Sequence, residues 1–134
     1  MATILAHITV RAGQEERFEE LARQLYQATH ASESGVRAYE YWRGQAPGSY
    51  YALLAFEDHQ SFVEHQTSGH HDEAGPGLRE VIDHLHLEWV DPVVGASELP
   101  PTGHQPAPES ANSSIREVTD RFAAEVADWW GNRP

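Results

Sequence analysis

The chain contains neither cysteine nor lysine among its 134 residues. Without cysteine there are no disulfide bonds, no thiol nucleophiles and no thiolate ligands for zinc, haem iron or iron–sulfur clusters. Without lysine there is no amine for Schiff-base chemistry, which excludes enzymes that use pyridoxal phosphate. Chemistry in this chain therefore rests on imidazole, carboxyl, hydroxyl and guanidinium groups.

Basic side chains are also scarce, with nine against 21 acidic ones and a formal net charge of -12. This balance argues against nucleic acid as a partner, because backbone binding relies on cationic contacts to phosphate, and against docking on anionic lipid. No apolar run approaches the ~20 residues that cross a bilayer. The start of the chain lacks the basic and apolar regions of a signal peptide. We expect a soluble cytoplasmic protein with no membrane partner.

Hydrophobic patterning predicts the element order β-α-β-β-α-β. The strands are apolar runs rich in β-branched or aromatic residues, and the first helix has its apolar residues spaced by three and four. The two middle strands form a hairpin. Strands are expected at residues 3–11, 36–43, 50–57 and 85–90, and helices at 15–31 and 59–67, with an irregular segment at 68–77 and a helical turn at 78–83.

This order is that of a ferredoxin-like, split β-α-β layer, an α+β fold. The helices cover one face of the sheet, and nothing within these elements covers the other. Because an apolar sheet face has to be buried, we expect a homodimer in which a second subunit covers it.

The composition changes after residue 91, where prolines, glycines and serines become frequent. We expect a domain at residues 1–94, a linker at 95–112, and an amphipathic helix with the chain end at 113–134. Ser114 begins a sequence of the capping-box type, S-x-x-E, before apolar residues at heptad-like spacing. The helix would dock on its own body, on a partner subunit or on another protein, with its own body favoured. Deleting residues 95–134 is expected to leave the dimer folded.

Three histidines, His65, His70 and His71, lie within seven residues. Imidazole titrates closest to neutral pH, so such a cluster suggests proton transfer or metal binding. In one interpretation, His65 or His70 is a general base and the other donates a hydrogen bond to the resulting anion. In the alternative, both close the end of a helix and cap its carbonyl groups. His71 is a candidate substrate contact.

Other histidines fall on strands. His7 lies in the middle of the first strand, on the side opposite its apolar residues, and is a candidate catalytic residue facing a pocket. His84 and His86 form an H-x-H pair on one strand face, a spacing found in metal sites, and His65 or His70 could add a third ligand. No carboxylate at a recognisable spacing completes that set, so His84 and His86 are weak metal candidates.

Aromatic and arginine residues give further candidates. Tyr39 and Tyr41 share one face of the second strand, where such residues belong to a core, an interface or a substrate site. Arg43 or Arg79 could hold an anionic substrate group, with a surface ion pair as the alternative. We take Tyr39, Tyr41, His71 and Arg79 as the candidate substrate contacts. No serine lies in a G-x-S-x-G elbow, so a hydrolase triad has no support.

Three stretches together resemble the antibiotic biosynthesis monooxygenase domain, which includes quinol monooxygenases and haem-degrading enzymes. The first is the apolar run at residues 4–10 with residues 11–15 after it. The second, residues 33–40 with Arg43, is similar to the family pattern E-P-G-x-x-x-Y-E-x-x-R. The third is similar to A-H-x-x-S-x-H and comprises Phe62, His65, Ser68 and His70. The resemblance covers residues 3–92.

The resemblance implies a dimeric α+β barrel and an oxygenase with no bound metal, flavin or other cofactor. In such enzymes a phenol or quinol supplies the electrons to dioxygen, and the protein removes a proton and excludes water. His65 stands where haem-degrading and polyketide-oxidising relatives often have tryptophan, and His7 where haem-degrading relatives have asparagine. No histidine stands at their axial ligand position, near Gly75. A cofactor-independent monooxygenase is favoured over a non-catalytic binding or scaffold protein, and a metal- or haem-binding barrel is the weakest alternative.

Overall fold

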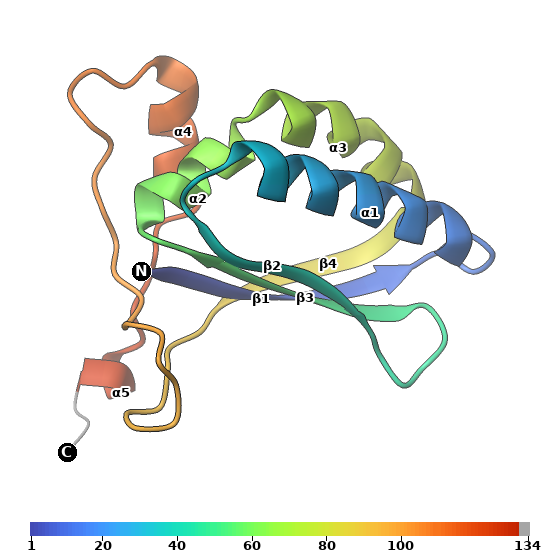
Figure 1. Ribbon diagram of the computed structural model, residues 1–134, viewed down its shortest axis with the longest axis horizontal. Coiled ribbons are helices and arrows are strands. Elements are labelled where there is room, and N and C mark those ends of the chain that lie inside the picture. Colours follow the sequence, from blue (N-terminus) through green and yellow to red (C-terminus); the bar gives the residue numbers. More distant parts are fainter. Residues whose placement is uncertain (132–134) are drawn as a thin grey trace.

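The computed structural model describes residues 1–131, in which helices cover one face of an antiparallel sheet (Figure 1). The four strands lie in the order β2-β3-β1-β4. The predicted element order is confirmed, with one further helix between α2 and β4. The elements are β1 (Ala2–Val10), α1 (Glu15–Ser32), β2 (Val36–Arg43), β3 (Ser49–Phe56), α2 (His59–Gln66), α3 (Gly69–Val81), β4 (Ile82–Trp89), α4 (Ser113–Arg121) and α5 (Asp128–Gly131).

Side-chain alternation along the strands places the core on the helical side of the sheet. In β1 the residues at even positions, from Ala2 to Val10, are buried, and the register sets Ile4 beside Leu54 of β3. Tyr39 of β2 pairs with the same Leu54 and therefore lies on this face. The apolar stripe of α1 packs onto it through Phe18, Leu21, Ala22 and Leu25. We call the opposite side, which none of the helices described within residues 1–131 covers, the open face (Figure 1).

The segment expected to be irregular is helical, because α3 starts at Gly69. Its first turn is capped by Ser68, whose hydroxyl accepts a hydrogen bond from the backbone N–H of His71 at 3.3 Å. Gly77 lets α1 approach closely, since a Cβ there would lie 3.3 Å from the methyl groups of Leu21. Pro76, inside the helix, argued against this assignment from sequence, but packing against α1 outweighs its low helix propensity.

The C-terminal helix expected to be continuous is instead two short helices, α4 and α5. The cap of α4 is Asn112, whose side chain accepts from the N–H of Ile115 at 2.9 Å, so the capping box expected at Ser114 is wrong. The helix ends at Arg121, and beyond it the N–H of Ala124 donates to Nδ1 of His104 at 3.2 Å. A contact with the preceding linker therefore replaces the next helical hydrogen bond. The expected chain end at 132–134 lies outside the described residues.

The linker at residues 95–112 lies along the body of the chain. Thr102 is buried, and its hydroxyl donates to the carbonyl of Val90 at 2.8 Å and accepts from the N–H of Thr3 at 3.2 Å. The N–H of Gly103 donates to the carbonyl of Met1 at 3.0 Å. These bonds satisfy backbone groups at the ends of β1 and β4, so the linker completes one end of the sheet.

His59, at the start of α2, holds the next part of the tail. Its ring is fully buried, with Nε2 2.9 Å from the carbonyl oxygen of Phe122, and its Nδ1 accepts from the N–H of Gln105 at 3.1 Å. Phe122 also packs on Phe62 of α2. The tail thus docks on its own chain. No helix within residues 1–131 is long and apolar enough to span a membrane.

Glu19 of α1 ties this helix to the hairpin. It accepts two hydrogen bonds from Arg43, at 2.6 and 2.8 Å, and one from the hydroxyl of Tyr50 at 3.0 Å. The bond from Arg43 is the main reason why the pKa of Glu19 falls from 4.5 to about 2. The ionised form is therefore the one that the fold stabilises.

We predict that this pairing stabilises the protein above pH 4.5 and that the contribution is lost as the pH falls toward 2. Glu19→Gln should remove this pH-dependent contribution to the free energy of unfolding. We expect about 0.5–1 kcal/mol, a modest amount because Arg43 is well exposed. Urea unfolding at neutral pH and at pH values between these two limits measures it. Glu64→Gln, on the exposed side of α2, is the control. Equal pH dependence in Glu19→Gln and the parent chain would contradict the prediction.

Candidate functional site

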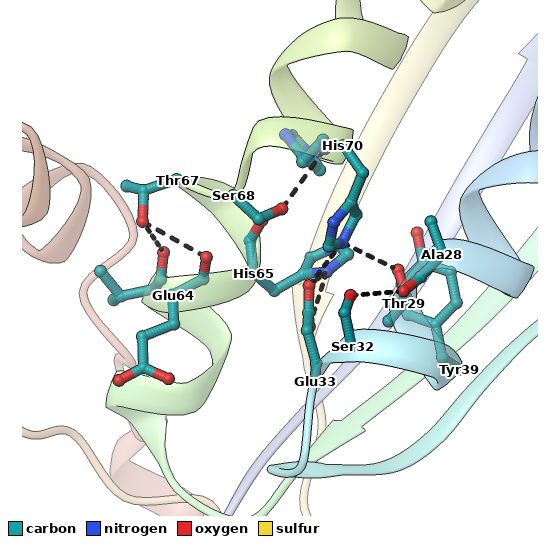
Figure 2. A network of polar contacts seen from close by, with 12 residues as sticks. Ala28, Thr29, Ser32, Glu33, Tyr39, Glu64, His65, Thr67, Ser68 and His70 are labelled. Carbon is teal, nitrogen blue, oxygen red and sulfur yellow. Dashed lines mark hydrogen bonds and ion pairs between the residues drawn. The ribbon is translucent and has the colours of Figure 1, made fainter.

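Three side chains from three elements meet between the helices and the sheet (Figure 2). Nδ1 of His65 lies 3.0 and 3.1 Å from the two carboxylate oxygens of Glu33. Nε2 of His70 lies 2.6 Å from Oε1 of the same carboxylate. We call these three residues the Glu33 cluster. One carboxylate here accepts hydrogen bonds from two imidazoles.

Helix ends produce this meeting point. Glu33 is the C-cap of α1, in an extended conformation, with its backbone N–H bonded to the carbonyl of Thr29 at 3.0 Å. His65 is near the end of α2, and His70 is in the first turn of α3. Five residues apart on one continuous helix, the two histidines would point in different directions. The break between α2 and α3, with Ser68 extended, turns both toward Glu33.

Burial makes the Glu33 cluster a low-dielectric site. The side chain of His65 is 1% exposed, that of Glu33 14% and that of His70 22%. Burial alone would raise the pKa of Glu33, but the hydrogen bonds and charges of His65 and His70 outweigh it, so the pKa is lowered. Glu33 is therefore an anion at neutral pH. This assigns the hydrogens that face it to Nδ1 of His65 and Nε2 of His70.

His71 stands beside the Glu33 cluster without bonding to Glu33. Its ring lies edge-on to His65, with 5.1 Å between centroids. Burial is the main reason why the pKa of His71 is lowered to about 4, and a positive charge on His65 would lower it further. His71 is therefore a neutral imidazole at physiological pH, suited to polar contact rather than to carrying charge.

Two tyrosines extend the Glu33 cluster along β2. The ring of Tyr39 lies 4.9 Å from that of His65, and its hydroxyl is 3.0 Å from that of Tyr41. Burial raises the pKa of Tyr39 well above its usual value, with Tyr41 and the charge of Glu33 adding to the effect. Burial also raises the pKa of Tyr41. Both are neutral phenols, so each hydroxyl can donate and accept.

Tyr41 also lines a groove of about 580 Å³ between α1 and β2, which we call the α1–β2 groove. Five of its eleven lining residues are aromatic, and a bound ring could stack on them. The ion pair of Glu19 and Arg43 is part of the lining. The lining residues are Phe18, Glu19, Ala22, Arg23, Tyr26, Gln27, Glu40, Tyr41, Trp42, Arg43 and Tyr50.

The structure does not bring His7 or Arg79 to the Glu33 cluster. His7 is on the open face, where its Nε2 lies 3.0 Å from Oε2 of Glu88. Its neighbours Ala6 and Ile8 face the helices, so the sheet separates it from His65. Arg79 is exposed in the last turn of α3, with its guanidinium beside Gly75.

His84 and His86 also lie on the open face, both exposed, and His86 is next to His7. Among residues 1–131, the side chains that gather three metal-ligating atoms within 4.8 Å are those of Glu33, His65 and His70. Sequence reasoning had selected both histidines of this group but not the carboxylate. The one sequence feature that could have indicated Glu33 is its position at the start of the second resemblance stretch, directly after a predicted helix.

Comparison with known proteins gives one family and a common fold. The sequence model described as antibiotic biosynthesis monooxygenase matches residues 1–76. Among curated proteins, none matches. A solved structure of a candidate antibiotic biosynthesis monooxygenase from Caulobacter crescentus has a TM-score of 0.66 at 20% identity, covering 69% of this chain and 89% of the other. One from Bacteroides thetaiotaomicron has a TM-score of 0.67 at 15% identity, covering 73% and 94%. At such identities the structures show a shared fold.

Proposed function

Since this chain belongs to the antibiotic biosynthesis monooxygenase family, we propose that it is a monooxygenase that oxidises a small aromatic or quinol-type molecule with dioxygen, without a bound metal or flavin. One observation carries the proposal. A buried carboxylate holds two imidazoles, and two neutral phenols connect this cluster with an aromatic-lined groove. The α1–β2 groove is the proposed substrate site, and Tyr39 and Tyr41 lie between it and the base.

In this reaction the substrate loses a phenolic proton to the Glu33 cluster, and the electron-rich anion reduces dioxygen. For a hydroquinone, one oxygen atom enters the ring to give a hydroxyquinone and the other leaves as water. The substrate supplies all the electrons, so no external reductant is consumed. We assign the base to His70, because it is the more exposed of the two imidazoles. His65, which is 1% exposed and faces Glu33 with its Nδ1, holds that carboxylate in position. Glu33 stabilises the imidazolium that forms.

Closure of the open face is part of the proposal. Trp42 is 59% exposed and Tyr51 40% exposed, both on this face. We propose that a second copy of the chain covers it to form a dimeric α+β barrel, since large apolar surfaces on a sheet face need a partner. His7 and Glu88 would then lie between the subunits and have no part in proton removal.

Oxygen consumption with a panel of hydroquinones and hydroxylated polycyclic phenols tests the proposal. We expect saturable uptake, one oxygen molecule per product and water rather than peroxide as the second product, all unchanged by a chelator. Consumption no faster than in buffer would contradict it. If the same compounds then bound saturably, by calorimetry, the chain would be a non-catalytic binding member of the fold.

A further inference from the structure

We infer that Glu33, His65 and His70 also form a binding site for a divalent transition-metal ion of the zinc and cobalt class. Two imidazole nitrogens and one carboxylate oxygen are the ligand set of many three-residue metal sites, which keep a further position open for water. Here the ligating atoms, Nδ1 of His65, Nε2 of His70 and a carboxylate oxygen of Glu33, lie within 4.8 Å of one another.

The geometry is near that of an occupied site. Metal–ligand distances of ~2.0–2.2 Å place ligand atoms about 3–3.5 Å apart. The two nitrogens already lie 3.0 and 2.6 Å from Oε1 of Glu33. Side-chain shifts of about 1 Å or less would admit an ion. Each imidazole would hold its hydrogen on the ring nitrogen that faces away from the ion, so neither ring changes charge.

Two of the three ligands are fixed before any ion arrives. His65 packs between Tyr39 and Phe56, with ring centroids 4.9 and 5.3 Å away. Glu33 is held by the backbone bond at the end of α1. His70 is partly exposed and provides the side from which an ion can enter. Such preorganisation favours binding, because little side-chain freedom is lost.

Donor chemistry selects the class of ion. Imidazole nitrogens favour zinc, cobalt, nickel and copper, whereas magnesium and calcium require mostly oxygen ligands. The ligands come from the C-cap of α1 and from α2 and α3, so an ion would link the three helical segments and raise the thermal midpoint. The site does not depend on oxygen chemistry. If the proposed function holds, however, the ion and the substrate proton compete for the imidazole lone pairs, and zinc inhibits.

The test is titration of the untagged, metal-stripped full chain with Zn²⁺ by calorimetry and with Co²⁺ by visible absorption. We expect one ion per chain, a Co²⁺ ligand-field spectrum and a Zn²⁺-dependent rise in the thermal midpoint. Glu33→Gln and His70→Asn each remove a ligand while keeping the side-chain size similar. Each should weaken binding by more than the ~10–100-fold typical of losing an outer partner of a metal ligand.

The matched control is the double variant His84→Ala/His86→Ala, which removes the exposed pair on the open face. It should bind as tightly as the parent chain. The inference is overturned if the parent gives no Co²⁺ spectrum, if both cluster variants bind normally, or if only the double variant loses the ion. Binding is read without turnover, so a negative result here leaves the oxygenase proposal standing, and the absence of oxygen uptake leaves the metal site standing.

Discussion

Deleting residues 95–134 should lower the free energy of unfolding by several kcal/mol, contrary to the expectation from sequence that the body would not need its tail. The first reason is His59. Its ring is fully buried, and both nitrogens bond backbone groups of the tail, Nε2 the carbonyl of Phe122 and Nδ1 the N–H of Gln105. Deletion would leave these polar atoms without partners wherever water cannot reach them, at a cost of about 1–3 kcal/mol.

The second reason is aromatic packing. Phe62 is fully buried beneath Phe122, with 5.6 Å between ring centroids at a near-perpendicular angle. Losing a buried aromatic side chain costs about 3–5 kcal/mol, and Phe122, being only partly buried, should contribute less. Phe122→Ala alone should therefore reproduce a substantial part of the destabilisation that the deletion causes.

Urea unfolding of the full chain, the truncated chain and Phe122→Ala measures this. Trp129→Ala is the control, because Trp129 is 71% exposed and its loss should change stability by no more than about 0.5 kcal/mol. Identical midpoints for the full and truncated chains would show that the tail contacts contribute nothing. In that case residues 1–94 would fold as an independent domain, as the sequence suggested.

His70→Ala should reduce turnover in the oxygen-uptake assay by about 100-fold or more, the usual contribution of a general base. Glu33→Gln should act in the same direction, because a neutral amide cannot stabilise an imidazolium. The expected loss is in kcat rather than in KM, since neither residue lies among those that line the α1–β2 groove.

Two further measurements separate catalysis from folding. The thermal midpoint of His70→Ala should stay close to that of the parent, because the side chain is partly exposed at the start of α3. Glu64→Gln, which changes an exposed side chain of α2 away from the open face, should retain full turnover. If His70→Ala kept activity within about threefold of the parent, His70 would not be the base, and His65 would become the residue to test.

The strands and α1 could be predicted from sequence because their burial follows simple periods. Alternation in β1 and the three-and-four spacing in α1 each report a face buried against the same core. The N-terminal part of α3 could not be predicted from sequence. Gly75, Pro76 and Gly77 have low helix propensity, and the helix depends on close packing against Leu21. Such tertiary stabilisation leaves no local signal.

The candidate site was predictable only in part. The cluster of His65 and His70 stands out by composition, yet their meeting depends on a helix break at Ser68 and on a carboxylate from the end of α1. Glu33 is one of 21 acidic residues, and its place at the start of the second resemblance stretch does not mark it as the partner of these histidines. His7 shows the converse. The alternation in β1 correctly places His7 on the side opposite the apolar residues. Which side chains lie next to it depends on how all four strands pair, and the strand's own sequence does not give that information.

The strand order β2-β3-β1-β4 also bears on how the chain is made. Strand β1 leaves the ribosome before the other three strands but lies inside the sheet, with β3 and β4 as its neighbours. Until β4 has been synthesised, one of its edges has no partner, and unpaired strand edges are where chains join one another incorrectly. Slow elongation before Ile82 should therefore raise the aggregated fraction of newly made protein, and a chaperone that shields extended segments should lower it.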